Sequence, residues 1–180
     1  PNSINELEIL ADELKMTFLQ VSERCKQMAE INPMLGKRGV RLGILLPELY
    51  KMQVKAIIKA SISVYGKNQK EFPPEIMLPM VSCFKEVNLL KKLIDDVVAE
   101  INKEINFPVN YKLGVMVETP RAALKAGELA IISSFLSFGT NDLTQMTYGL
   151  SRDDSGTFMR DYLEKGIFPV DPFRSLDLDG

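Results

Sequence analysis

The stretch that decides the fold is SFGTNDLTQ, residues 137–145, together with the apolar run Phe135 to Phe138 that leads into it. The run has the length of a buried strand. Gly139 then permits a tight turn of the backbone, and a threonine, an asparagine and an aspartate follow at once. Ligands of α/β proteins bind at the carboxyl ends of strands, so the stretch predicts a binding site. A capped strand-to-helix turn without a ligand is the alternative, because Asn and Asp favour such turns.

Helix signals and apolar runs alternate on both sides of this stretch. Pro47 suits the first turn of a helix and Gly66 its end, and Thr119 before Pro120 is a strong helix start. The expected helices cover residues 1–31 (the leading helix), 47–65, 84–104 and 120–130. The expected strands cover residues 75–81, 112–117 and 135–138, with a further short strand near 44–46.

This alternation predicts parallel strands joined by crossover helices. A complete barrel of eight such strands typically needs about 250 residues, whereas the chain has 180. We therefore predict the α/β class and a partial (β/α)8 TIM barrel, with about four parallel strands. The chain would be a single fragment of one domain over residues 1–180. Strand and helix repeats over 32–150 would carry the site motifs, and residues 151–180 would form a loop, a short helix and a connector.

Composition narrows the possible chemistry. The chain has no histidine, so a zinc site is disfavoured and a metal should be a hard cation held by oxygen. The net charge of −2, without a basic run, argues against nucleic-acid binding. No apolar stretch approaches the length of a membrane span, and two cysteines are too few for a disulfide scaffold. We expect a cytoplasmic protein, or a plastid or microbody protein if eukaryotic, with neither nucleic acid nor membrane as partner.

Two carboxylates are predicted to meet. Glu118 follows one expected strand and Asp142 the next, so both belong to the same edge of the sheet. Two like charges ~4 Å apart repel by roughly 4 kcal/mol at an effective dielectric constant near 20. A shared proton, an arginine or Mg²⁺ could offset this, and Mg²⁺ suits a chain without histidine. Alternatively, Glu118 caps the helix that follows it.

Arginines near glycines are the other candidates. Arg38 lies between Gly36 and Gly39, and a guanidinium offers a planar fork for phosphate or carboxylate. A solvated surface loop is the alternative for Arg38. Arg121 begins a helix, where a cation is unfavourable, so we expect it to pair with a carboxylate such as Glu118.

Three stretches together resemble a known family: NPMLGKRGVRL (32–42), MVETPRAAL (116–124) and SFGTNDLTQ (137–145). In this order they are similar to the phosphoenolpyruvate (PEP)-utilising enzymes, which include pyruvate phosphate dikinase, PEP synthase and enzyme I of the bacterial sugar phosphotransferase system. With residues 146–154 and 162–173, the chain most resembles the dikinase family.

The resemblance implies a function for the full-length protein. Dikinases convert ATP, phosphate and pyruvate to AMP, diphosphate and PEP. A swivelling domain carries a phosphohistidine to a C-terminal (β/α)8 barrel, where pyruvate is phosphorylated. The implied partners are pyruvate or PEP, ATP at another domain, that swivelling domain and a second subunit of a homodimer.

Matching the motifs assigns roles to single residues. Glu118 and Asp142 would bind Mg²⁺, and Arg38 would hold the phosphoryl group. The substrate-binding set implied by the resemblance is Arg38, Glu118, Gly139, Thr140, Asn141 and Asp142.

The departures from the family pattern matter as much. The family's catalytic histidine and barrel cysteine are absent, and Lys37 stands where the family often has histidine. We therefore predict no catalytic residue in the chain and no turnover by the chain alone. The alternatives are the same barrel from PEP synthase or enzyme I, or a non-catalytic binding module.

Overall fold

The computed structural model describes residues 3–30 and 32–178. They belong to two compact units, residues 1–38 and 39–180, and each is described by itself. Among the described residues, no helix combines the length and the apolar character needed to cross a membrane.

The first unit begins with two helices. Ser3 caps the first through a capping box with Glu6. Lys15 then takes a left-handed conformation, with φ 53°, and ends it. Thr17 starts the second helix by a capping box with Gln20. The elements are α1 (Ile4–Leu14), α2 (Phe18–Met28) and the 3-10 turn η1 (Pro33–Leu35).

The prediction of one leading helix over residues 1–31 is therefore wrong. The second capping box interrupts the helix, because its two side-chain bonds satisfy the backbone groups of a new helix start. Residues 1, 2 and 31 of that prediction lie outside the described residues.

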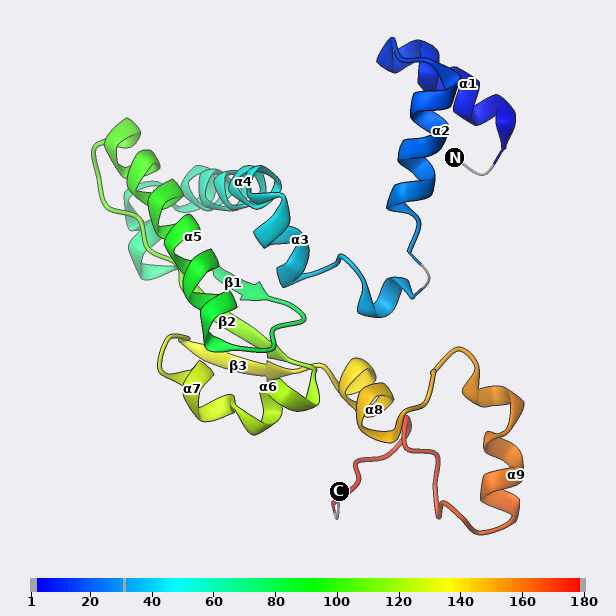
Figure 1. Cartoon of the computed structure of the whole chain (residues 1–180). Helices are drawn as coiled ribbons and strands as arrows, with labels where there is room; N and C mark the ends of the chain where they lie inside the picture. The colour runs from blue at the N-terminus through cyan, green and yellow to red at the C-terminus, as the bar shows by residue number, and fades with distance from the viewer. Residues whose placement is uncertain (1–2, 31, 179–180) are drawn as a thin grey trace. The chain divides into compact units, whose positions relative to one another are not determined.

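The second unit has a parallel three-stranded sheet in the order β1-β2-β3 (Figure 1). The strands are β1 (Glu75–Leu78), β2 (Lys112–Val117) and β3 (Phe135–Phe138). In the register, Leu78 pairs with Val115 and Val117 with Phe138, so the three carboxyl ends lie at one edge. Long crossovers connect the strands, as parallel pairing requires. The α/β class is confirmed, with three strands in the described part of the chain.

Helices precede the sheet of the second unit and also follow each of its strands. They are α3 (Val40–Leu45), α4 (Pro47–Tyr65), η2 (Gly66–Glu71), α5 (Phe84–Ile105), α6 (Pro120–Leu124), α7 (Ala126–Ala130), α8 (Thr140–Tyr148), η3 (Ser155–Thr157) and α9 (Met159–Glu164). The helix predicted for residues 47–65 and the strands predicted for 112–117 and 135–138 are confirmed to the residue.

The core lies between the sheet and its helices. Ile58 of α4, Ile94 of α5 and Val115 of β2 are all fully buried in it. The apolar stripe of α5 is buried along its length, and its members are Val87, Leu90, Ile94, Val97, Val98 and Ile101. Each such side chain contributes about 1.5–3 kcal/mol of burial free energy.

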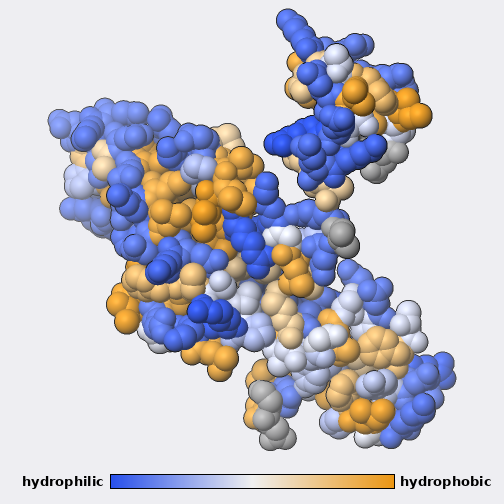
Figure 2. All heavy atoms as spheres, in the orientation of Figure 1, coloured by the Kyte–Doolittle hydropathy of each residue, from blue (hydrophilic) through white to orange (hydrophobic). Residues whose placement is uncertain are grey.

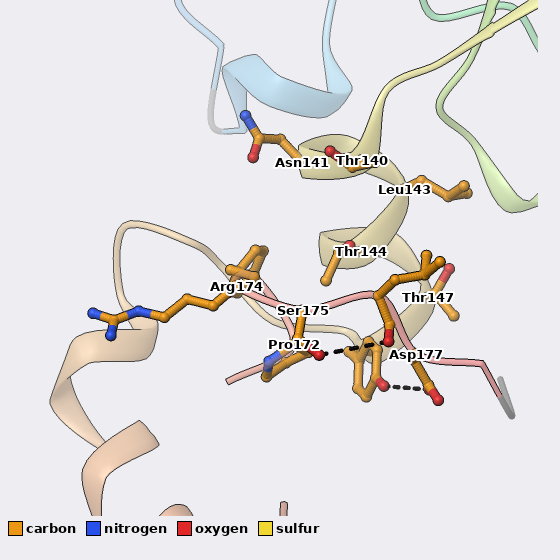
Figure 3. A pocket seen from close by; sticks show the side chains of 12 residues that line it. Thr140, Asn141, Leu143, Thr144, Thr147, Pro172, Arg174, Ser175 and Asp177 are labelled. Atoms are coloured by element: carbon orange, nitrogen blue, oxygen red, sulfur yellow. Dashed lines mark hydrogen bonds between the residues drawn. The ribbon is translucent and has the colours of Figure 1, made fainter. Parts of the chain in front are cut away.

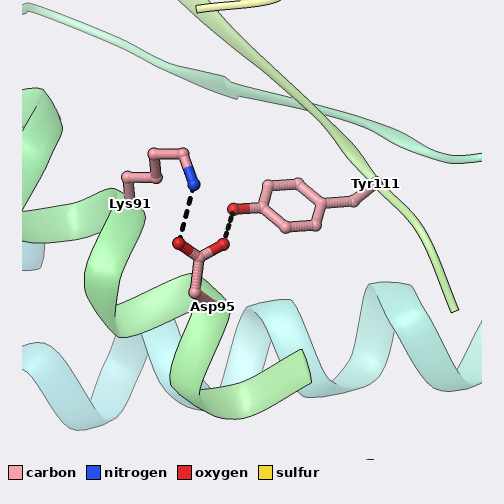
Figure 4. A network of polar contacts seen from close by, with 3 residues as sticks. All are labelled: Lys91, Asp95 and Tyr111. Atoms are coloured by element: carbon pink, nitrogen blue, oxygen red, sulfur yellow. Dashed lines mark hydrogen bonds and ion pairs between the residues drawn. The ribbon is translucent and has the colours of Figure 1, made fainter. Parts of the chain in front are cut away.

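A polar network fastens α5 to the segment entering β2 (Figure 4). The Tyr111 hydroxyl donates to Asp95 Oδ1 at 2.5 Å, and Lys91 Nζ donates to Oδ2 at 2.7 Å. Burial, and then the Asp95 carboxylate, raise the pKa of Tyr111 well above its ordinary value. The network lies at the amino end of β2, away from the edge where site residues are expected.

The short strand expected near residues 44–46 is absent, and α3 occupies this stretch. The Val40 N–H donates to Pro79 O at 2.9 Å, and helical spacing then buries both Val40 and Gly43. Tyr50 packs over Gly43 and donates its hydroxyl to Gly39 O at 2.8 Å. A helix gives these contacts, so the three-residue apolar run was a misleading strand signal.

Other boundaries differ less. The strand expected to reach residue 81 ends at Leu78, and the helix expected over 120–130 is divided at Lys125 into α6 and α7. Residues 151–178 contain loop, η3, α9 and an irregular tail, with Gly166 in a left-handed conformation after α9, as is common at helix ends. Residues 179–180 lie outside the described part.

Apolar side chains also remain on the surface of the second unit. Figure 2 shows them gathered over the region of α3, α4 and β1. Exposed members are Leu45, Leu46, Met52, Ile57 and Met77.

Candidate functional site

The carboxyl ends of β2 and β3 bring the predicted acidic residues to one edge of the sheet. Val117 and Phe138 end the two strands and are paired, and the Gly139 N–H extends the pairing by donating to Val117 O at 3.0 Å. Glu118 is the next residue after β2, and Asp142 lies in the first turn of the helix after β3. The structure thus confirms the prediction that both residues follow strands at the same edge of the sheet.

Glu118 is a buried carboxylate, with 7% of its surface exposed. Its Oε1 accepts a hydrogen bond from the Met80 N–H at 2.5 Å. Its Oε2 lies against Gly139, where an added Cβ would stand 2.6 Å from both Oε2 and the Glu118 Cβ. Glycine at 139 is therefore a steric requirement of this carboxylate position.

Thr119 caps the helix after β2. Its hydroxyl oxygen accepts from the Ala122 N–H at 3.1 Å and donates to Val81 O at 2.9 Å. The side-chain cap of α6 is therefore Thr119, and not its neighbour Glu118 as the alternative proposed. The guanidinium of Arg121 donates to the carbonyl oxygen of Ser82.

The three residues after Gly139 form the first turn of α8. Thr140 and Asn141 are exposed, and Asp142 is half-buried. A carboxylate is favourable in this first turn, because the helix dipole is positive there. Within the residues that the structure describes, the Asp142 side chain makes no hydrogen bond or ion pair. Its oxygens are available for a cation or a ligand.

Arg152 was missed by sequence reasoning. Its guanidinium donates to Asn141 Oδ1, and its N–H donates to Gln145 Oε1 at 2.9 Å. The loop after α8 is thereby fastened back onto that helix. The sequence carried no signal for this contact beyond the presence of a cation in the loop.

A cavity of about 320 Å³ lies between α8 and the tail (Figure 3). Thr140, Asn141 and Thr144 line one side, and residues 172–177 line the other. The Tyr148 hydroxyl donates to Asp177 Oδ2 at 2.6 Å and ties the tail to the helix. Two residues of the predicted substrate set therefore border this cavity.

Arg38 is the last residue of the first unit and is exposed. Its N–H donates to Gly36 O at 3.0 Å. The role of Arg38 as a phosphoryl-binding residue stays a prediction.

Comparison with known proteins identifies the family. The family described as "PEP-utilising enzyme, PEP-binding domain" matches residues 5–174. The chain belongs to this family. The resemblance read from the three motifs is confirmed.

Similar curated proteins support a narrower assignment within the PEP-binding domain family. A pyruvate, phosphate dikinase of Rickettsia prowazekii (strain Madrid E) is 43% identical over 180 residues, all of this chain and 20% of the relative. One from Giardia intestinalis is 44% identical over 171 residues, 95% of this chain and 19% of the relative. A chloroplastic one from Mesembryanthemum crystallinum is 48% identical over 161 residues, which are 89% of this chain and 17% of the relative. The chain thus spans about a fifth of the length of these relatives.

The donor groups of this PEP-binding domain fit Mg²⁺. The chain offers carboxylate oxygens from two adjacent strand ends and has no histidine. Among the described residues there is no group of three or more acidic, cysteine or histidine side chains that could hold a metal ion. Mg²⁺ commonly takes one or two carboxylates and completes its octahedron with water and substrate oxygens. Glu118 and Asp142 are carboxylates of this kind, and their role as metal ligands stays a prediction.

Proposed function

We propose that the full-length protein is a pyruvate, phosphate dikinase and that this chain forms part of its PEP/pyruvate site. Membership of the PEP-binding domain family and the names of the relatives support the reaction. The observation that carries the site is the buried Glu118 carboxylate, packed on Gly139 at the edge that also presents Asp142.

The three parallel strands and their crossover helices favour a part of a (β/α)8 barrel. In such barrels the loops at the carboxyl ends of the strands build the active site. Glu118 and residues 139–142 follow β2 and β3 at that end. The site therefore lies where this architecture places its chemistry.

In this proposal Glu118 and Asp142 hold Mg²⁺, which would stabilise negative charge on the oxygens of pyruvate. Glu118 is pre-oriented by the Met80 N–H, so its carboxylate needs little reorganisation. Thr140 and Asn141 offer hydroxyl and amide groups to the substrate from the first turn of α8. Arg38 would hold the phosphoryl group through its planar guanidinium.

The histidine that carries the phosphoryl group and the residue that exchanges a proton with the methyl carbon would lie outside this chain. The proposed partners are accordingly pyruvate or PEP, a mobile phosphohistidine domain and a second subunit of a homodimer. The mobile domain follows from the reaction, which needs a nucleotide step at one place and a pyruvate step at another, and the homodimer follows from the resemblance to the dikinases.

The test replaces Glu118 by glutamine in the full-length protein. Glu118→Gln should lower pyruvate phosphorylation by about 10²–10³-fold, the usual effect of removing one stabilising group for the developing charge. Exchange between ATP and AMP at the histidine should persist. Glu128→Gln is the matched control, because Glu128 is an exposed glutamate that pairs with Lys125 on α7.

Three outcomes decide the proposal. Selective loss of the pyruvate step supports it. Loss of both partial reactions would show that Glu118 is needed for the fold and not specifically for the pyruvate step. An unchanged pyruvate step would show that Glu118 is not part of the site. Measuring diphosphate release that depends on added phosphate separates a dikinase from a PEP synthase.

A further inference from the structure

The loop between β1 and α5 is bonded to the loop after β2 along its length. The Met80 N–H donates to Glu118 Oε1 at 2.5 Å, and Thr119 Oγ1 donates to Val81 O at 2.9 Å. The Arg121 guanidinium donates to Ser82 O. These contacts join consecutive residues of one loop to the proposed site segment of the other, so the first loop sets the position of the second.

Met80 has an unusual backbone for its residue type. Its φ is 57°, in the left-handed region that side-chain-bearing residues rarely occupy, and its side chain is 2% exposed. A residue stays in such a conformation only where its surroundings determine it, and these places cluster at functional sites. In this conformation the Met80 N–H points at the buried carboxylate.

The neighbours of Met80 hold this conformation in place. The Val40 N–H donates to Pro79 O at 2.9 Å, which fixes the peptide before Met80. Gly39, also left-handed with φ 57°, packs so closely that an added Cβ would stand 2.8 Å from the Met80 Cβ. Any side chain at Gly39 would displace Met80, so these two residues form one packed unit beneath Glu118.

We propose that Met80 is a positioning residue for Glu118. Its left-handed main chain, supported by Gly39, directs one N–H at Oε1 and so fixes the rotation of the carboxylate. Oε2 is held in turn against Gly139. This inference rests on the proposed function, since the group being positioned is the proposed metal ligand. What Met80 contributes is its backbone geometry, and the thioether serves only to fill space.

Two substitutions at Met80 separate backbone geometry from side-chain packing. Asparagine tolerates the left-handed region but places an amide in a buried apolar position. Valine preserves apolar character but is strongly disfavoured there because it is β-branched. A positioning role predicts that Met80→Val is the more damaging for metal binding. A merely structural role predicts the reverse order, since the buried amide would cost more.

The measurement is the dissociation constant of Mn²⁺ alone, followed by electron paramagnetic resonance on the full-length protein without nucleotide. Mn²⁺ binding at the proposed site is defined as the binding that is lost in Glu118→Gln. Met80→Val should weaken that part by about 10–100-fold, as for other groups that orient metal ligands. Met80→Asn should stay within about threefold, although the unfolding temperature of Met80→Asn falls further. Equal effects on Mn²⁺, or the reverse order, would overturn the inference.

A measurement on the unmutated backbone covers the case in which Met80→Val does not fold. In protein labelled with ¹⁵N-methionine, the Met80 amide proton should resonate far downfield, because it donates a short hydrogen bond to a carboxylate. It should move upfield in Glu118→Gln. An ordinary chemical shift for the Met80 amide proton that does not change in Glu118→Gln would refute the positioning role. If the unsubstituted protein has no Mn²⁺ site sensitive to Glu118→Gln, the proposed metal site fails, and the amide result still tests the contact itself.

Discussion

Gly139→Ala is the sharpest test of how the site edge is built. The added Cβ would stand 2.6 Å from Glu118 Cβ and Oε2 and 3.2 Å from Met116 Sδ. The shorter separations fall about 0.8 Å below the 3.4 Å at which ordinary contact begins. Gly139 has φ −86°, which alanine accepts, so the penalty comes from the clash and not from the backbone.

We expect Gly139→Ala to lower the free energy of unfolding by about 1–3 kcal/mol, the usual cost of overpacking a filled site. For a chain of this size that corresponds to a fall of roughly 2–12 °C in the unfolding midpoint. The measurement is urea unfolding followed by circular dichroism, with the slope checked for two-state behaviour.

Gly127→Ala is the matched control. Gly127 lies in α7 with open space where a Cβ would be, so alanine should stabilise by up to about 1 kcal/mol through helix propensity. The cause of the Gly139 penalty is isolated in a Glu118→Gly background, where both short contacts disappear. The penalty should shrink there, with a coupling of about 1 kcal/mol or more. An undiminished penalty, or a Gly139→Ala protein as stable as the original, would refute the reasoning.

Substitutions at three further residues test contacts that support the fold. Tyr111→Phe should cost about 1 kcal/mol at pH 7. Because the pKa of Tyr111 is raised in the folded state, this contribution is present below pH about 10 and is lost as the pH rises through the folded-state pKa. Tyr111→Phe should therefore flatten the fall in unfolding free energy at alkaline pH. Gln69→Leu should cost roughly 2–4 kcal/mol in urea unfolding, because the buried Gln69 amide donates to Asn110 O and accepts from Asn110 N–H. Thr119→Val should cost about 1–3 kcal/mol and Thr119→Ser less than half of that, since serine keeps the hydroxyl that caps α6 and reaches Val81.

The elements that sequence predicted best are those fixed by local signals. The helix over 47–65 has Pro47 in its first turn and Gly66 after its end, and both signals act within a few residues. The strand over 112–117 is an apolar run with polar residues at its borders, and it pairs on both sides as such runs do. Local chemistry was sufficient here because tertiary packing agreed with it.

The errors arose where tertiary contacts decided. The run at 44–46 resembles a strand, but the preceding residues are drawn into a helix by Pro79 O and by Tyr50, from elsewhere in the chain. The break after Lys15 had a sequence signal, the capping box of Thr17 and Gln20, which the prediction of one helix over residues 1–31 overlooked. Periodicity alone cannot show an interruption that lies between two amphipathic helices.

The proposed site also depends partly on local sequence signals and partly on tertiary contacts. The motif around Glu118 indicated which residue would carry charge, and strand order indicated the edge on which it would lie. The contacts that orient its carboxylate come from Met80 and Gly139, which are 38 and 21 positions away in the chain. Both act through the main chain, one by an N–H and the other by lacking a Cβ. A left-handed methionine leaves no trace in composition or periodicity, so the acidic residue could be found from the sequence while its orientation could not. It follows that Met80→Val and Gly139→Ala, neither of which alters a charge, should change how the proposed site binds a cation.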